Sequence, residues 1–179
     1  MKTITAHLNP MTPYSRIATP LGPMIIAMRD TSLAGAWFEG QKHFPARDAT
    51  WVEVAHAEVL DEATRELDEY FAGRRTTFEV PQAGRGTPFQ QEVWRAIAAV
   101  PYGDTITYGE LARRVGHPRG VRAAGAATGR NPLSIFVPCH RIVGADGRLT
   151  GYAGGLDRKR ALLARERDAQ ALQLDLRAA

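Results

Sequence analysis

Short apolar runs separated by turn residues make up the beginning of the chain. Residues 14–20, 23–30 and 32–40 are rich in Ile, Leu, Ala and Trp. They are separated by Pro-Leu-Gly-Pro and Arg-Asp-Thr, which are typical turn sequences. The pattern predicts a small antiparallel meander of strands.

A helical period follows these predicted strands. Between residues 52 and 73, acidic residues occupy one face and Gly73 stands where a helix commonly ends. The apolar positions that recur at helical spacing are Leu60, Ala63, Leu67, Tyr70 and Phe71. Residues 76–80 (TTFEV) then predict a further strand, and residues 81–86 (PQAGRG) have the composition of a linker. We therefore expect two domains, residues 1–84 and residues 85–179.

The second half of the chain predicts short helices. Thr87 and Gln90 form a capping box around Pro88, a residue favoured at the first helical position. The apolar stripe of this helix is Phe89, Val93, Trp94, Ile97 and Val100. A second capping box, Thr107 with Glu110, opens a helix that ends at Gly116, and residues 119–131 predict another. Two short helices joined by a Gly/Pro turn are typical of a helix-turn-helix.

The second helix of this pair carries almost no bulky side chain. Small residues surround Arg122, although glycine inside a helix costs up to about 1 kcal/mol relative to alanine. Such a smooth face permits close approach of another backbone. That backbone belongs either to a neighbouring helix of the same protein, which is the more common use of small residues, or to a nucleic acid.

Net charge divides the chain near Gly84. Residues 1–84 hold 8 basic and 11 acidic residues, a net charge of −3, whereas residues 85–179 hold 15 and 8, a net charge of +7. Concentrated basic charge is expected of a surface that meets phosphates. An arginine-rich composition without such a function explains the charge equally well.

Cysteine and histidine usage excludes two kinds of stabilisation. The single Cys139 has no partner for a disulfide, which favours a reducing compartment. It makes no zinc-ligand spacing with the histidines, which are His7, His43, His56, His117 and His140. The N-terminus lacks the apolar core of a signal peptide, and no apolar run approaches the roughly 20 residues that span a bilayer. We expect a cytoplasmic protein with neither metal nor membrane segment.

Cys139 itself is the candidate for chemistry. It follows an apolar run, residues 133–137, that predicts a buried strand, and Pro138 stiffens the backbone before it. His140 is a potential base, but adjacent side chains of an extended chain point to opposite faces, so contact requires a turn or a bridging water. The alternative is a small buried thiol without chemistry, as most free cysteines are.

A carboxylate that could hold such a base lies in the last predicted helix. Leu162 and Leu163 are expected to face inward, and Glu166 falls on the same face, four and three residues later. An exposed Glu166 paired with a neighbouring arginine is the alternative.

The motifs of the second half resemble those of one family. Residues 89–166 are similar to the C-terminal domain of O6-alkylguanine-DNA alkyltransferases, the methylated-DNA–protein-cysteine methyltransferases. The resemblance rests on "PCHR", "GDTITYGELA", "RNP" and "GYAGG", in the family's order and spacing. The first half resembles the family's ribonuclease H-like domain by pattern. The implied fold class is α/β (α+β), a small sheet-plus-helix domain followed by a mostly helical winged helix-turn-helix domain.

The resemblance implies a reaction and roles in it. An alkyl group passes once from O6-alkylguanine, and also from O4-alkylthymine, in duplex DNA to Cys139. His140 activates the thiol through a water, and Glu166 orients the imidazole. Tyr108 rotates the target phosphate and protonates the guanine leaving group. Arg122 fills the space of the flipped-out nucleotide.

Further residues of the motifs acquire supporting roles by the same resemblance. Asn131 links the recognition helix to the active-site segment, and Arg141 supports the site structurally. The backbone of Ile142 contacts the flipped base, and Tyr152 walls the pocket. Four small residues of the recognition helix are expected to face DNA: Ala123, Ala124, Gly125 and Ala126.

One position departs from the family pattern. Ala153 stands where several relatives carry a serine hydroxyl near the lesion oxygen. Only its backbone N–H can donate there, so we hypothesise that the pocket accepts bulkier alkyl groups. No cofactor or metal is implied. The expected partner is double-stranded DNA containing O6-alkylguanine, bound by a protein that is monomeric in solution, with cooperative binding on DNA left open.

Three other functions compete with this interpretation. A cysteine hydrolase needs an oxyanion hole, which a helix-turn-helix does not explain. A transcription factor would present Arg, Gln, Asn and Ser on its recognition helix rather than alanine and glycine. A damage-binding relative without chemistry is disfavoured because Cys139 is present, whereas non-catalytic relatives replace it.

Overall fold

The computed structural model describes residues 11–178, with side chains described through Ala171. His7 and most of the N-terminal stretch searched for a signal peptide lie outside the described residues. Three strands form the predicted antiparallel meander: β1 (Thr12–Ile17), β2 (Met24–Arg29) and β3 (Ser32–Phe38). A fourth strand, β4 (Trp51–Glu53), pairs in parallel with β1, so the order is β3-β2-β1-β4.

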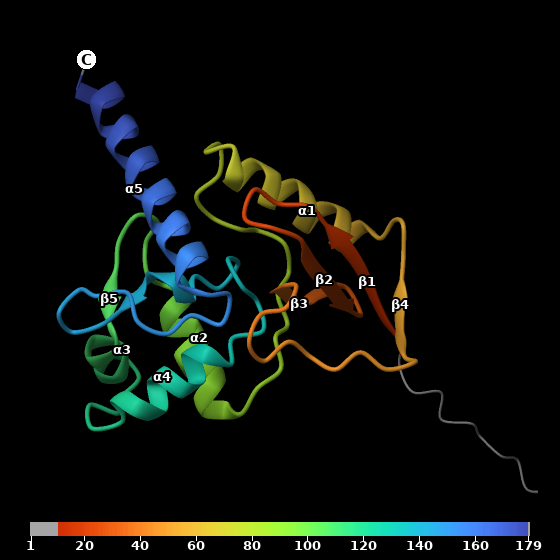
Figure 1. Cartoon of the computed structure of the whole chain (residues 1–179), viewed down its shortest axis with the longest axis horizontal. Helices are drawn as coiled ribbons and strands as arrows, with labels where there is room; N and C mark the ends of the chain where they lie inside the picture. The colour runs from red at the N-terminus through yellow and green to blue at the C-terminus, as the bar shows by residue number, and fades with distance from the viewer. Residues whose placement is uncertain (1–10, 179) are drawn as a thin grey trace, which may run out of the picture.

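Helix α1 (Glu58–Phe71) packs on this sheet through the predicted apolar stripe (Figure 1). All five residues of the stripe are buried. The helix begins later than the sequence pattern predicted, because residues 51–53 form β4. Gly73 follows the helix with φ +73°, a left-handed conformation that glycine adopts without steric cost.

The strand predicted for residues 76–80 is wrong. The backbone N–H groups of Glu79 and Val80 donate to the buried carboxylate of Glu66, at 3.0 to 3.2 Å, instead of to a neighbouring strand. Arg75 pairs with the same carboxylate at 3.1 Å. A helix side chain therefore fixes this segment, and period-two alternation carries no signal for such a contact.

The second half contains the predicted helix-turn-helix. Helix α2 (Pro88–Ala98) has the full Thr87–Gln90 capping box, α3 (Tyr108–Arg114) follows β5 (Ile106–Thr107), and α4 (Val121–Gly129) packs on α2 and α3 (Figure 1). The second capping box is only half formed. Thr107 accepts from the Glu110 N–H at 3.1 Å, but the Glu110 side chain pairs with Arg114 at 2.6 Å instead.

Residues 133–137 are buried as predicted but form no regular strand. Ile135 has φ +75°, which breaks the extended backbone, and only single bridges form, from Leu133 to Ala36 and from Ser134 to Val137. The bridge to Ala36 joins this segment to β3. The chain then continues from residue 137 into a 3-10 turn, η1 (Cys139–Arg141), and into β6 (Ile142–Val143), which pairs in parallel with β5. The last element is helix α5 (Leu156–Ala178).

One apolar core continues from the sheet into the helices. It contains Phe38 and Leu67 from the first half and Ile97 and Leu111 from the second. The described architecture is an N-terminal sheet domain with a helical C-terminal domain, which confirms the predicted mixed α/β class. None of the described helices is long and apolar enough to cross a membrane.

Candidate active site

Cys139 lies at the first position of η1, and its side chain is almost completely buried. The amide of Asn131 contacts it directly, with Nδ2 donating to Sγ over 3.2 Å. The same Nδ2 donates to the Val137 carbonyl at 2.8 Å, and Oδ1 accepts from the Leu133 N–H at 3.0 Å. Asn131 follows α4 by two residues, so it joins this helix to the segment that carries the thiol, as its predicted role requires.

His140 and Glu166 form a hydrogen bond of 2.7 Å between Nε2 and Oε1, and both side chains are fully buried. The inward orientation predicted for Glu166 from Leu162 and Leu163 is confirmed. A carboxylate only accepts, so we assign the imidazole proton to Nε2. Nδ1 is then the basic nitrogen, and it is buried without a partner among the described groups.

Further donors hold the Glu166 carboxylate. Arg141 donates to it through Nε at 2.8 Å and Nη2 at 3.0 Å, Tyr70 through its hydroxyl at 2.8 Å, and Gly103 through its N–H at 3.1 Å. Burial alone raises the pKa of Glu166, but the hydrogen bond from His140 and the charge of Arg141 outweigh it and lower the pKa to about 2. Glu166 is therefore ionised at neutral pH.

The environment of Cys139 and His140 favours the neutral form of both side chains. Burial raises the pKa of the Cys139 thiol, while the hydrogen bond from Asn131 and the charge of Lys159 act in the opposite direction. Burial lowers the pKa of His140 despite its bond to Glu166. A neutral imidazole beside a protonated thiol is thus the resting state, and the site needs a proton transfer before the sulfur can act.

Lys159 is a site residue that the sequence interpretation missed. Its side chain is completely buried, and Nζ donates to the carbonyls of Ile142 at 2.5 Å and Thr150 at 2.8 Å. Burial lowers its pKa to about 8. The signal was available, because Lys159 lies seven residues before Glu166, on the same inward face of α5.

Tyr108 begins α3 behind its N-cap residue, Thr107. Its hydroxyl donates to the carbonyl of Thr150 or Gly151, each at 3.2 Å. Burial raises the pKa of the phenol, and proximity to Cys139 adds to this effect. A Tyr108 hydroxyl that stays protonated is suited to donate a proton rather than to accept one.

A cavity of about 650 Å³ opens beside these groups. Five of the predicted site residues line it, namely Tyr108, Tyr152, Ala153, Gly125 and Ala126. Cys139 itself does not; it is buried at 4% exposure. The Tyr152 ring lies edge-on to the His140 ring, with their centroids 6.5 Å apart, and so connects the cavity wall to the base.

Helix α4, the predicted recognition helix, has both exposed and buried residues. Arg122, Ala123 and Ala126 are exposed, whereas Ala124 is completely buried in the core. The prediction that the Ala124 side chain faces DNA is therefore wrong, because it packs the helix pair instead. A Cβ on Gly125 would lie 3.6 Å from the Tyr108 ring, so this glycine gives the helix close contact with that ring.

Two residues assigned to the substrate pocket do not line the cavity. Arg141 is buried, and its guanidinium binds Glu166 and, at 2.6 Å, the Val100 carbonyl, in keeping with a structural role. Ile142 is also buried, its N–H donates to the Cys139 carbonyl, and its own carbonyl accepts from Lys159. The Ile142 N–H is thus occupied, whereas its carbonyl keeps a second lone pair, so the expected contact of this backbone with a base stays a prediction.

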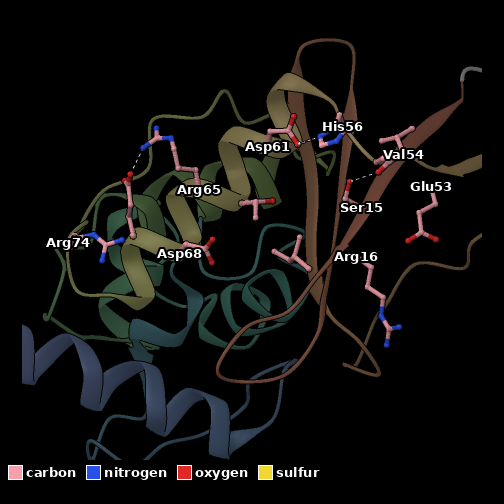
Figure 2. Close-up of a pocket in the computed structure, with 13 residues that line it drawn as sticks. Ser15, Arg16, Glu53, Val54, His56, Asp61, Arg65, Asp68 and Arg74 are labelled. Carbon is pink, nitrogen blue, oxygen red and sulfur yellow. Dashed lines mark hydrogen bonds and ion pairs between the residues drawn. The ribbon is translucent and has the colours of Figure 1, made fainter.

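A larger cleft, of about 840 Å³, lies between β1, β4 and α1 in the first half of the chain (Figure 2). Some of its polar side chains contact one another. Arg65 pairs with Glu69, His56 lies 3.9 Å from Asp61, and Ser15 donates to the Val54 carbonyl at 3.0 Å (Figure 2). The cleft contains no thiol, and none of its lining residues belongs to the predicted site.

Among the residues that the structure describes, no three His, Cys, Asp or Glu side chains converge to hold a metal ion.

Comparisons with known proteins agree with this geometry. Residues 13–83 match the family model of the 6-O-methylguanine DNA methyltransferase ribonuclease-like domain, and residues 88–168 match that of its DNA binding domain. A methylated-DNA–protein-cysteine methyltransferase of Methanosarcina acetivorans is 46% identical over 84% of this chain and 95% of its own length. Another, from Mycobacterium tuberculosis, is 44% identical over 91% of this chain and 97% of its own.

Solved structures show the same relationship. The crystal structure of Mycobacterium tuberculosis OGT in complex with DNA has a TM-score of 0.82 and 43% identity, covering 88% of this chain and 94% of that one. A structure of O6-methylguanine methyltransferase from the same organism has a TM-score of 0.82 and 44% identity, covering 89% and 94%. The chain belongs to the methylated-DNA–protein-cysteine methyltransferase family.

Proposed function

We propose that this protein repairs DNA by transferring the alkyl group of O6-alkylguanine to Cys139. The observation that carries the proposal is the placement of a buried thiol, bonded to Asn131, next to a His140–Glu166 pair and beside a cavity lined by Tyr108 and the recognition helix. A neutral site of this kind needs no external cofactor, because the sulfur is both nucleophile and final acceptor.

The first step forms the nucleophile. The Cys139 proton passes to Nδ1 of His140, through a bridging water, and the imidazolium is stabilised by Glu166 at 2.7 Å. Asn131 Nδ2 and the charge of Lys159 stabilise the thiolate. Burial disfavours the Cys139 thiolate and the His140 imidazolium in the resting site. Because the same burial leaves the thiolate weakly solvated, the thiolate is reactive once it has formed.

The second step is alkyl transfer. The Cys139 sulfur attacks the alkyl carbon, an S–C bond forms, and the bond from that carbon to guanine O6 breaks with its electron pair moving into the purine. Tyr108 donates the proton that neutralises the departing base. The net result is the thiol proton exchanged for the alkyl group, since the proton held by His140 replaces the one that Tyr108 gives up.

The third part of the proposal concerns DNA. A guanine stacked in a duplex cannot bring its O6 substituent to a buried sulfur, so the nucleotide must leave the helix at a cost of a few kcal/mol. Arg122 is exposed at the start of α4, and its proposed role is to occupy the vacated space, with the small Ala123 and Ala126 allowing close approach. O4-alkylthymine is a second substrate on the same grounds.

The product is a thioether, which no second group in the site can release. Each molecule therefore reacts once. We propose that residues 85–179 form the domain with the DNA-binding and transfer machinery, that residues 1–84 form the N-terminal ribonuclease H-like domain, and that the protein acts as a monomer in solution. Cooperative binding on DNA is compatible with this proposal.

Intact-protein mass spectrometry tests the transfer. The parent and Cys139→Ser are mixed with a duplex carrying one O6-methylguanine. We expect the parent to gain one methyl group, located on Cys139, with a yield limited to one per protein, and Cys139→Ser to gain none. If neither protein changes mass while both bind the duplex, the repair function is refuted and a damage-binding role becomes the better explanation.

A further inference from the structure

A loop of the first half of the chain reaches the mouth of the active-site cavity. Lys42 and His43, between β3 and β4, line the cavity together with Arg130 at the end of α4. The distribution of charge along the chain does not predict this, because residues 1–84 carry a net charge of −3 and the basic excess lies in the second half. The loop therefore adds positive charge from the acidic half of the chain to the rim of the site.

Hydrogen bonds fix the loop to the segments that build the site. The buried Gln41 accepts through Oε1 from the Phe38 N–H at 2.9 Å and from the hydroxyl of Ser134, in the segment that leads to Cys139, at 3.3 Å. Lys42 donates its N–H to the Ala153 carbonyl at 2.9 Å. The loop is therefore positioned by both the thiol segment and the cavity wall.

The backbone of the loop is held in an uncommon conformation. His43 has φ +61°, in the left-handed region that a non-glycine residue adopts at a cost of about 1 kcal/mol. Strained backbone of this kind concentrates at functional sites. The anchors on Gln41 and Lys42 keep it in place.

The charges at the mouth are of one sign. Lys42, His43 and Arg130 are exposed, no carboxylate lines the cavity, and within residues 11–171 neither Lys42 nor Arg130 forms an ion pair. Slight desolvation lowers the pKa of the exposed His43, and the charges of Arg130 and Lys42 lower it further, so these groups lie close enough to repel. A set of cations held together in this way favours an anion between them.

We infer that Lys42, with Arg130, binds a backbone phosphate of the DNA strand whose nucleotide enters the cavity. This inference rests on the proposed function and extends DNA recognition to the first half of the chain. A base in the cavity remains tied to its strand, so a phosphodiester must pass the mouth where Lys42 and Arg130 stand. The flexible lysine acts as a point charge toward that phosphate.

Salt-dependent binding tests the inference in the full chain. Affinity for a duplex with one O6-methylguanine is measured between about 0.05 and 0.4 M salt, in a Cys139→Ser background that prevents transfer. The variants are Lys42→Ala, Lys42→Arg and, as a matched control, Arg74→Ala, which removes an exposed positive charge from the cleft at α1 (Figure 2).

We expect Lys42→Ala to bind about eightfold more weakly at 0.1 M salt and to lower the salt slope by about 0.9, the amount for one phosphate contact. Lys42→Arg should restore both quantities, and Arg74→Ala should change neither. Equal behaviour of Lys42→Ala and Arg74→Ala at all salt concentrations would overturn the inference. So would weaker binding with an unchanged slope, which indicates a packing role.

A second readout separates this inference from the proposed function. Alkyl transfer from free O6-methylguanine base, which has no phosphate, is followed by protein mass in chains that retain Cys139. Lys42→Ala should react with the free base at the parental rate, and a slower reaction contradicts a role limited to the phosphate. Absence of transfer from the O6-methylguanine duplex in the parent refutes the proposed chemistry, whereas the salt slopes still decide whether Lys42 binds DNA.

Discussion

Replacing Glu166 by glutamine probes the centre of the buried network. The carboxylate accepts five hydrogen bonds, one each from His140, Tyr70 and Gly103 and two from Arg141. Glutamine has nearly the same shape but no charge, and its amide nitrogen cannot accept a hydrogen bond. The substitution therefore leaves the Arg141 guanidinium buried without a counter-ion.

The structure sets the size of the effect in two ways. The pKa of Glu166 falls from 4.5 to about 2 on folding, which at about 1.4 kcal/mol for each pH unit corresponds to about 3 kcal/mol of stability. Removing one partner of a buried ion pair costs about 3–5 kcal/mol. Both arguments predict that Glu166→Gln lowers the free energy of unfolding at pH 7 by about 3 kcal/mol.

The lowered pKa of Glu166 also determines how its contribution to stability changes with pH. Because the folded-state pKa is lowered, the stabilisation is complete above pH 4.5 and is lost as the pH falls from 4.5 toward about 2. Between pH 5 and pH 3 the parent should lose about 2 kcal/mol that Glu166→Gln does not lose. The comparison between the two proteins isolates this group, since Asp48, Glu62 and Glu69 also have lowered pKa values and titrate in both.

Urea unfolding at several pH values measures these quantities. The matched control is Glu92→Gln, at an exposed position of α2 that forms no ion pair among the described residues, and it should change stability by less than about 0.5 kcal/mol. Alkyl transfer by Glu166→Gln should also slow by about 100-fold or more, because His140 loses the group that stabilises its imidazolium. If Glu166→Gln matches Glu92→Gln in stability, or loses as much stability in acid as the parent, the reasoning is refuted.

Three further substitutions test single contacts of the site. Asn131→Ala removes the N–H···S bond to Cys139, so transfer at pH 7 should slow about tenfold and its pH profile should move to higher pH; an unchanged profile contradicts the assignment. Gly154→Ala places a Cβ 2.7 Å from the ring of Tyr152, which lines the cavity. The ring must therefore move, and transfer of a benzyl group should slow more than transfer of a methyl group, as rates measured with the two substrates in competition would show. Ala153→Ser should shift preference toward methyl, and an unchanged methyl-to-benzyl ratio removes the pocket-size hypothesis.

Local patterns predicted the elements whose causes are local. The stripe from Leu60 to Phe71 placed α1, and the Thr87–Gln90 box indicated the start of α2. The spacing of Glu166 from Leu162 and Leu163 predicted that its side chain faces the core, where it is fully buried. Each of these signals lies within a few residues of the feature that it predicts, so it is readable from the sequence alone.

Patterns failed where distant residues decide the local conformation. Residues 76–80 have strand composition, but the carboxylate of Glu66 captures their N–H groups. Residues 133–137 are apolar enough for a buried strand, yet Ile135 turns the chain with φ +75°. Neither feature leaves a periodic trace, because hydrophobic period reports burial and not the partner of each backbone group.

The chemistry of the site divides in the same way. The sequence by itself indicated the candidate nucleophile and its neighbouring candidate base, and it determined the helix face that carries the carboxylate. Only the tertiary structure decided that Tyr70, 96 residues from Glu166, donates to the same carboxylate, that the charge of Lys159 acts on the pKa of the thiol, and that a loop at Lys42 borders the cavity. Periodicity determines which way a side chain faces, but the group that it meets there is set by how separate elements pack, and that is a property of the whole fold.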